Sequence, residues 1–261
     1  NRMIESIQTV GSIGALLNKD GDKIYVVDRD PKKGRVFVEY DARYVFYYED
    51  ARGKHRSMTG APLQRVQCAT NKEFIKEQRI RSNKQLYEHD INPVFRCLEE
   101  NYLGKETPKL NVMFFDIEVD FDPDRGYSTT DDPFMPITAI SCYMSWTDQL
   151  VTFAVPPKTI SMDDAKELTK RFDNTMLFEK EKDMLDAFLQ LVEDADILSG
   201  WNSEGYDIPY TVGRIQKVLS GDDKRRLCFW GEKPKRRVFE KYGREQLSFD
   251  LVGRVHLDLL E

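Results

Sequence analysis

The chain has 261 residues, of which 40% are hydrophobic and 11% aromatic, enough to bury the cores of one or two globular domains. Its formal net charge of -6 argues against a general polyanion-binding protein, so any contact with nucleic acid has to come from local basic patches. The four dispersed cysteines disfavour a zinc site or disulfide scaffold, and no segment resembles a signal peptide or a membrane span. We therefore expect a soluble protein of a reducing, cytoplasmic compartment.

The N-terminal part of the chain is rich in short β-prone runs. Between residues 7 and 48 such runs lie at 23–27, 35–40 and 44–48, separated by turn-forming residues, and they predict a small, mostly antiparallel sheet. The charged segments 71–81 and 83–87 are expected to form surface helices at most, and apolar side chains recur at near-helical spacing from Val94 to Leu103. We place a domain boundary near Leu110, which predicts a β-rich N-terminal domain over residues 1–109.

The remaining residues, 110–261, predict a mixed α/β domain. A strand at 112–119 is followed by two apolar strands that form a hairpin, by a helix, a short strand and a second helix, and by a final β-prone run. The expected ranges are 136–143 and 149–155 for the hairpin, 163–171 for a short helix, 179–195 and about 207–219 for the two longer helices, 196–200 for the short strand and 247–260 for the last run. This order is typical of a ribonuclease-H-like mixed sheet with flanking helices, an α/β (α+β) fold.

The strand at 112–119 is apolar except for Asp116 and Glu118 near its end. Side chains alternate faces along a strand, so both acids point the same way, about 7 Å apart. Two like charges aimed at one place are costly unless they share a proton, a basic partner or a divalent cation. A strand whose polar end emerges into solvent is the simpler interpretation of this pair taken alone.

A second polar cluster follows the short strand at 196–200. The run from Trp201 and Asn202 leads to Tyr206 and Asp207, which places Asp207 at the start of a helix, where its side chain can reach over the edge of the sheet. Asp207 could instead simply cap this helix, since aspartate is a preferred N-cap residue. Trp201 and Tyr206 could likewise be core aromatics, and Asn202 a turn residue that closes its own backbone.

The two acid-bearing segments together, Asp116-x-Glu118 and Asn202-x-x-x-Tyr206-Asp207, resemble the first two motifs of the 3'-5' proofreading exonuclease of family B DNA polymerases. The Gly-Trp-Asn…Tyr-Asp-Ile-Pro-Tyr run, the β-rich leader and the basic Lys-Pro-Lys-Arg-Arg-Val segment are similar to the replicative polymerases of T4-type bacteriophages. The resemblance covers essentially the whole chain. It implies the N-terminal portion of a DNA-directed DNA polymerase, with an exonuclease that removes mispaired 3'-terminal nucleotides.

The resemblance also implies roles for individual residues. Asp116, Glu118 and Asp207 would hold two Mg2+ or Mn2+ ions, with Asp116 bridging the ions and Glu118 on the ion that activates water. Two cations about 4 Å apart can generate hydroxide and stabilise the leaving 3'-oxygen, and hard cations prefer carboxylate ligands. Asn202 and Tyr206 would flank the terminal nucleotide. Further DNA contacts are expected from Tyr127, between bases, and from Lys235, Arg236 and Arg237 on a hairpin, although a solvated charged face is the alternative for these basic residues.

The family's third motif, Tyr-x-x-x-Asp, is not found after Asp207. The match from Tyr127 to Asp131 comes too early in the chain, and the Asp-Thr-Asp polymerase signature is absent. We therefore expect an exonuclease domain that is incomplete at its C-terminal end and weakly active or inactive in isolation. The expected partners are single-stranded 3' ends, primer-template DNA and the remaining polymerase polypeptide, with RNA contact through the N-terminal domain as a further expectation and no membrane.

Two other functions remain open. The first is a non-catalytic nucleic-acid-binding or assembly module of a split polymerase, in which the carboxylates are present but the chain does not hydrolyse nucleic acid. The second is a stand-alone exonuclease whose fourth carboxylate has an unrecognised source, for which Asp131, Asp250 and Asp258 are the candidates.

Overall fold

A computed structural model describes residues 12–241 and 243–260, and the beginning of the β-prone region expected from residue 7 lies outside these residues. The chain divides into two compact units, Asn1–Lys109 and Leu110–Glu261, and each unit is described by itself. Among the described residues, no helix is long and apolar enough to cross a membrane.

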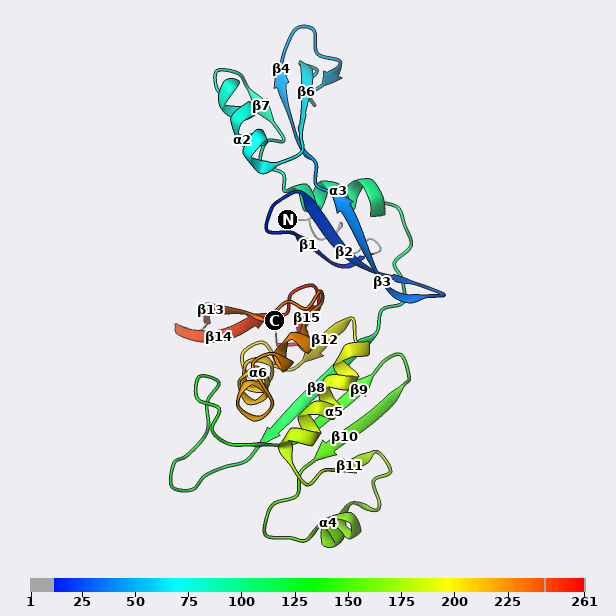
Figure 1. The fold of residues 1–261 in the computed structure, drawn as a ribbon, viewed down its shortest axis with the longest axis vertical. Helices are drawn as coiled ribbons and strands as arrows, with labels where there is room; N and C mark the ends of the chain where they lie inside the picture. The colour runs from blue at the N-terminus through cyan, green and yellow to red at the C-terminus, as the bar shows by residue number, and fades with distance from the viewer. Residues whose placement is uncertain (1–11, 242, 261) are drawn as a thin grey trace. The chain divides into compact units, whose positions relative to one another are not determined.

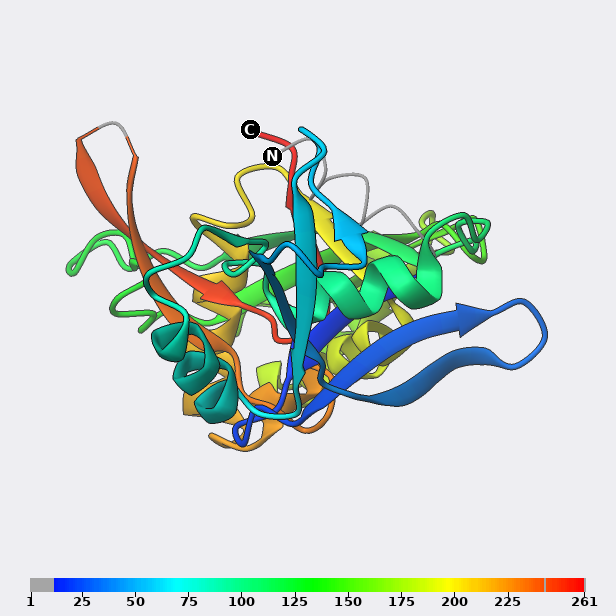
Figure 2. The same cartoon turned by 90° about the horizontal axis from the view of Figure 1, so that it is seen from above.

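The described residues of unit 1, from Ser12 onward, form two antiparallel sheets and two helices (Figure 1). The first sheet has the order β1-β2-β3, and the second has the order β5-β6-β4-β7. The strands are β1 Ser12–Leu17, β2 Lys23–Asp30, β3 Gly34–Asp41, β4 Tyr44–Glu49, β5 His55–Arg56, β6 Pro62–Cys68 and β7 Leu86–Tyr87, and the helices are α2 Asn71–Ile80 and α3 Pro93–Tyr102. Strands β2 and β3 extend outward as a two-stranded ribbon (Figures 1 and 2).

One hydrophobic cluster joins both sheets and both helices of unit 1. Ile24 of β2, Phe46 of β4, Phe74 of α2 and Leu98 of α3 all belong to it. The predicted strands and the helix after residue 93 are confirmed, but the expectation of one sheet is wrong, because the chain passes into a second sheet at Tyr44. The expectation of at most a helix at 83–87 is also wrong, because Leu86 and Tyr87 pair with β4.

Unit 2 is built on a six-stranded mixed sheet with the order β11-β10-β9-β8-β12-β15. Its strands are β8 Val112–Val119, β9 Ile137–Met144, β10 Gln149–Ala154, β11 Thr175–Leu177, β12 Ile197–Gly200 and β15 Val255–Asp258. Strand β9 is antiparallel to β8 and to β10, whereas β12 is parallel to β8 and to β15. This mixed α/β arrangement confirms the predicted ribonuclease-H-like fold, and it places β8 at the centre of the sheet.

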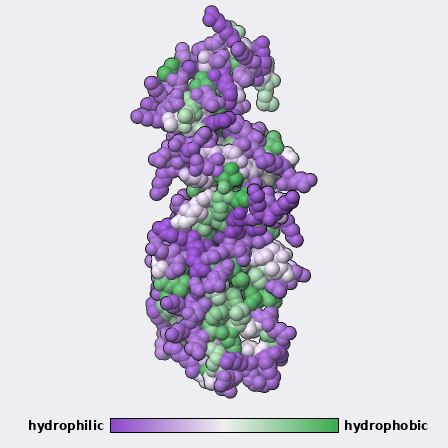
Figure 3. All heavy atoms as spheres, turned by 45° about the vertical axis from the view of Figure 1, so that its right-hand side comes forward, coloured by the Kyte–Doolittle hydropathy of each residue, from purple (hydrophilic) through white to green (hydrophobic). Residues whose placement is uncertain are grey.

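The helices of unit 2 are α4 Met162–Thr169, α5 Glu181–Asp194 and α6 Asp207–Val218, followed by a short 3-10 helix at Asp223–Leu227. Helix α5 buries Met184, Phe188 and Val192 at the spacing expected for one helix face, and the Phe188 ring lies 5.5 Å from that of Phe115 on β8. Figure 3 shows a largely hydrophilic surface on which hydrophobic side chains gather over unit 2.

The C-terminal part of unit 2 differs from the prediction. The run expected at 247–260 is two strands in different sheets, since β14 Arg244–Asp250 pairs with β13 Lys235–Lys241 and only β15 joins the main sheet. The turn at Gly253, with a φ of 83°, separates them. Figures 1 and 2 show the hairpin β13–β14 projecting from the unit.

Candidate functional site

Strand β8 presents Asp116 and Glu118 on one exposed face of the sheet. Met113, Phe115 and Ile117 alternate with them and are buried, so the apolar side chains fix the register that keeps both acids on the other face. The predicted alternation is therefore confirmed.

Asp207 reaches this strand from helix α6. It is the first residue of the helix and only 3% exposed, and its Oδ1 accepts a hydrogen bond of 3.1 Å from the backbone N–H of Ile117. The N-cap position belongs to Tyr206, which makes no side-chain cap hydrogen bond. The alternative in which Asp207 serves as the N-cap is thus wrong, because its carboxylate bonds to β8 between Asp116 and Glu118.

The electrostatics of Asp207 are those of a buried acid among other acids. Burial, assisted by the negative charges of Asp116 and Asp258, raises the pKa of its carboxyl to about 7, against the lowering effect of the Ile117 N–H. A carboxylate in this position favours either a bound proton or a cation. Carboxylate oxygens, such as those on β8 and α6, are the ligands that hard divalent cations prefer.

The side chains as placed do not close around an ion. Within residues 12–241 and 243–260, no group of three or more His, Cys, Asp or Glu side chains is arranged to hold a metal. Asp116 lies close enough to Asp207 for its charge to raise the pKa of that residue, and Glu118 lies on the same face of β8 as Asp116.

The loop from Trp201 to Tyr206 joins β12 to α6 and carries the other expected site residues. Asn202 has a φ of 54°, and its carbonyl accepts hydrogen bonds from the backbone N–H groups of Gly205 and Tyr206, so it does close its own turn. The Tyr206 ring is half-buried and lies 5.5 Å from the ring of Tyr210. Trp201 is 65% exposed and is therefore not a core aromatic.

Strand β15 holds this loop from one side. The Ser203 hydroxyl lies 2.8 Å from Nε2 of His256, and the backbone N–H of Glu204 donates to Oδ2 of Asp258 at 2.9 Å. Of the three alternative carboxylates, Asp258 is the one that acts on the pKa of Asp207. Asp250 forms an ion pair with Arg237, and Asp131 lies exposed on the loop before β9.

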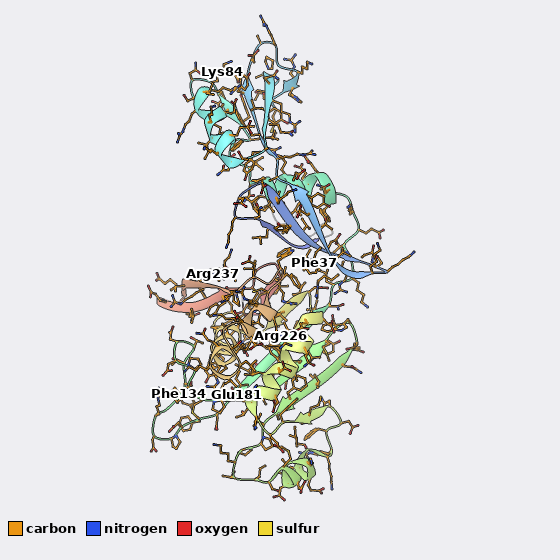
Figure 4. All side chains as sticks on the ribbon, in the orientation of Figure 1. Phe37, Lys84, Phe134, Glu181, Arg226 and Arg237 are labelled. Atoms are coloured by element: carbon orange, nitrogen blue, oxygen red, sulfur yellow. The ribbon has the colours of Figure 1, made fainter. Side chains whose placement is uncertain are left out.

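The loop between β8 and β9, residues 120–136, carries Tyr127. Its side chain is 85% exposed, and its ring lies 4.8 Å from that of Phe121. The far end of the loop is anchored on two helices by Arg214, which donates to the carbonyl oxygens of Pro133 and Phe134 and forms a buried ion pair with Glu181. Phe134 and Glu181 are labelled in Figure 4.

The expected basic residues lie on strand β13. Lys235 and Arg236 are exposed. The guanidinium of Arg237, labelled in Figure 4, instead forms an ion pair with Glu204 and a second one with Asp250 at 3.3 Å.

Sequence reasoning missed the residues that hold the loops: Glu181, Arg214, Glu204 and His256. Each of them acts through a contact with a residue at least 33 positions away, and no local pattern reports such contacts. The one available signal concerns Glu181 and Arg214, which are charged residues at helix positions that should face the core.

The chain matches the family described as DNA polymerase family B, exonuclease domain, over residues 64–261. This match covers more than half of the chain, including all of unit 2 and the end of unit 1 from within β6.

Individual relatives agree with this family. The DNA-directed DNA polymerase of Escherichia phage RB69 is 25% identical over 267 aligned residues, which cover 92% of this chain and 29% of that protein. The DNA-directed DNA polymerase of Enterobacteria phage T4 is 31% identical over 88 residues, or 33% of this chain and 10% of that protein. The DNA polymerase catalytic subunit of Saimiriine herpesvirus 2 (strain 11) is 29% identical over 117 residues, which cover 44% of this chain and 11% of that protein. The chain thus spans less than a third of the length of the relatives it matches.

Proposed function

We propose, since this chain belongs to the family of DNA polymerase family B exonuclease domains, that unit 2 is a 3'-5' exonuclease that removes mispaired nucleotides from DNA 3' ends as part of a replicative polymerase. Its substrates would be single-stranded 3' ends delivered from a primer-template. The remaining polymerase polypeptide would be its partner.

The carboxylates of Asp116, Glu118 and Asp207 would hold the divalent cations. The observation that carries this proposal is the hydrogen bond from the Ile117 N–H to Asp207, which fixes a buried acid of α6 between the two acids of β8. When bound, Mg2+ or Mn2+ would supply activation of water and stabilisation of the leaving 3'-oxygen. The rigidity of a central strand and a helix start gives these ligands defined positions before an ion arrives.

Aromatic and amide side chains around the carboxylates would orient the DNA. Tyr206, half-buried beside the site, presents a ring on which a base can stack, and Asn202 supplies hydrogen bonds. Tyr127 has the exposure required of a ring that packs between bases. Lys235 and Arg236 are exposed on β13 and would contact phosphates, whereas Arg237, expected to do the same, is already paired with Glu204.

The 261-residue chain by itself is proposed to hydrolyse DNA weakly or not at all, because three carboxylates do not form a complete two-ion site. In this proposal Asp258 holds the loop, since its two oxygens accept the backbone N–H groups of Glu204 and Leu260. A fourth ligand would come from outside these residues.

A nuclease assay tests the proposal. The chain is incubated with 5'-labelled single-stranded DNA and Mn2+, alongside the variant Asp116→Ala/Glu118→Ala and a chelator control. We expect at most slow shortening from the 3' end, lost in the variant and with the chelator. Robust chelator-sensitive shortening by the unmodified chain would contradict the proposal that a ligand is missing. Shortening that persists in the variant would contradict the proposal that Asp116 and Glu118 form the site.

A further inference from the structure

The loop that carries Asn202, Tyr206 and Asp207 is held from two sides, and Glu204 takes part in both contacts. On one side, the Glu204 backbone N–H donates to Oδ2 of Asp258 at 2.9 Å, at the end of β15. The other oxygen of Asp258 accepts from the backbone N–H of Leu260 at 2.9 Å, so this carboxylate is fixed by two main-chain donors.

On the other side, the Glu204 side chain contacts the hairpin β13–β14. Its carboxylate forms an ion pair with Arg237 and accepts a hydrogen bond of 3.4 Å from the Ser248 hydroxyl. Arg237 and Ser248 are directly opposite each other in the register of the hairpin, so one carboxylate contacts both strands. The Glu204 side chain is 14% exposed, whereas that of Arg237 is 47% exposed, so the pair lies at the edge of the packed surface.

A third contact lies beside the first two. A methyl group added at Gly205 would lie 3.1 Å from Oε1 of Gln246 on β14 and 3.1 Å from Oδ1 of Asn202. The hairpin therefore packs directly on the main chain of the loop. Glycine at this position permits the close approach.

Main-chain hydrogen bonds link the loop residues to the start of α6. The backbone N–H of Tyr206 donates to the carbonyl of Asn202 at 3.0 Å, and that of Ile208 donates to the carbonyl of Ser203 at 2.9 Å. Because these bonds lead directly into α6, a displacement of Glu204 is transmitted to Tyr206 and Asp207.

We infer that Glu204 is a positioning residue that couples the hairpin β13–β14 to the carboxylate site, with Arg237 as its partner on the hairpin. Arg237 then serves the loop, and the phosphate contacts of β13 fall to Lys235 and Arg236. DNA that moves the hairpin changes the position of Tyr206 and Asp207 as well. This inference rests on the proposed function for its meaning, but the coupling itself is a property of the folded chain.

Hydrogen exchange followed by mass spectrometry tests the coupling in the whole 261-residue chain, without DNA or metal. The variants are Glu204→Gln, Arg237→Met and the two combined, with Glu240→Gln as matched control, because Glu240 is an exposed glutamate on the same hairpin. Each single variant should raise amide exchange by about tenfold in both segments, the loop 201–208 and strand β14. In the loop, the double variant should add little to either single variant, because both changes remove the same Glu204–Arg237 pair, whereas the pair of Arg237 with Asp250 lies within the hairpin.

Three results would overturn the coupling: exchange that rises in the hairpin while the loop is unchanged, effects of the two single variants on the loop that multiply, or a control that behaves like Glu204→Gln. Arg237→Lys, which keeps the charge, should retain most of the protection. Thermal unfolding confirms that each variant is folded. Failure here leaves the nuclease proposal standing, because neither DNA nor metal takes part, and an inactive nuclease leaves the exchange result unchanged.

Discussion

The surroundings of Asp207 differ from those of an ordinary surface acid, because it is only 3% exposed and lies near other acids. Burial and the charges of Asp116 and Asp258 raise its pKa to about 7 in the absence of a cation. An acid whose pKa is higher in the folded than in the unfolded chain binds its proton more tightly when folded. The stability that this difference confers is present in full below about pH 4 and is lost as the pH rises to about 7.

We therefore predict that the free energy of unfolding of the metal-free chain falls by up to about 4 kcal/mol between pH 4 and pH 7 on account of Asp207. Urea unfolding in the presence of a chelator measures this. Asp207→Asn keeps an acceptor for the Ile117 N–H and should flatten the dependence, whereas Asp173→Asn, at an exposed position, should not. An equally steep fall in Asp207→Asn would refute the assignment.

At the scale of elements, the loop 120–136 is fixed to the helices by one buried ion pair. Both side chains of Arg214 and Glu181 are 10% exposed, and Glu181 also accepts the backbone N–H of Ile137 at 2.9 Å. Tyr210 adds a hydrogen bond from its hydroxyl to the carbonyl of Met135 at 2.8 Å. These contacts position the loop that carries Tyr127.

Arg214→Met should destabilise the chain by about 3–5 kcal/mol, because it leaves the Glu181 carboxylate buried without its charge partner. Chemical denaturation measures the loss, and limited proteolysis should show faster cleavage within 120–136. Glu167→Gln, which breaks the exposed pair with Lys170, should cost less than about 0.5 kcal/mol. A similar cost for both variants would mean that the buried pair contributes no more than a surface one.

Element types and most boundaries followed from local patterns. The apolar face of α5 and the alternation along β8 were predictable because each pattern follows from the burial of one face of one element. Of the candidate site, the sequence predicts that Asp116 and Glu118 lie on a strand and that Asp207 lies at the start of a helix. The Glu204–Arg237 and Arg214–Glu181 pairs were not, because charged residues paired across 33 positions look like solvated ones in sequence. The split of 247–260 into two sheets depends on a turn that only the tertiary fold selects.

At the scale of the whole molecule, the chain divides into two compact units, with the boundary between Lys109 and Leu110 in the sequence. Each has its own buried cluster and its own sheets. We propose that they are separate domains, a β-rich N-terminal domain and the exonuclease domain. RNA contact through the first domain stays a prediction.

A polypeptide of residues 110–261 should therefore fold without unit 1. We expect a single cooperative unfolding transition with a midpoint within a few degrees of one transition of the full chain, measured by calorimetry. The complementary polypeptide of residues 1–109 serves as the control. Failure of the 110–261 polypeptide to fold would show that unit 1 is needed for the stability of unit 2.

The central claim is that Asp116, Glu118 and Asp207 form a site for divalent cations, and the most direct measurement is Mn2+ binding followed by electron paramagnetic resonance. We predict saturable binding to the unmodified chain, with affinity reduced at least about tenfold in Asp116→Asn and in Asp207→Asn, since each change removes a charged oxygen ligand. Asp173→Asn should bind Mn2+ like the unmodified chain. Mn2+ binding that is equally tight in all four proteins, or absent from the unmodified chain at millimolar Mn2+, would contradict the account.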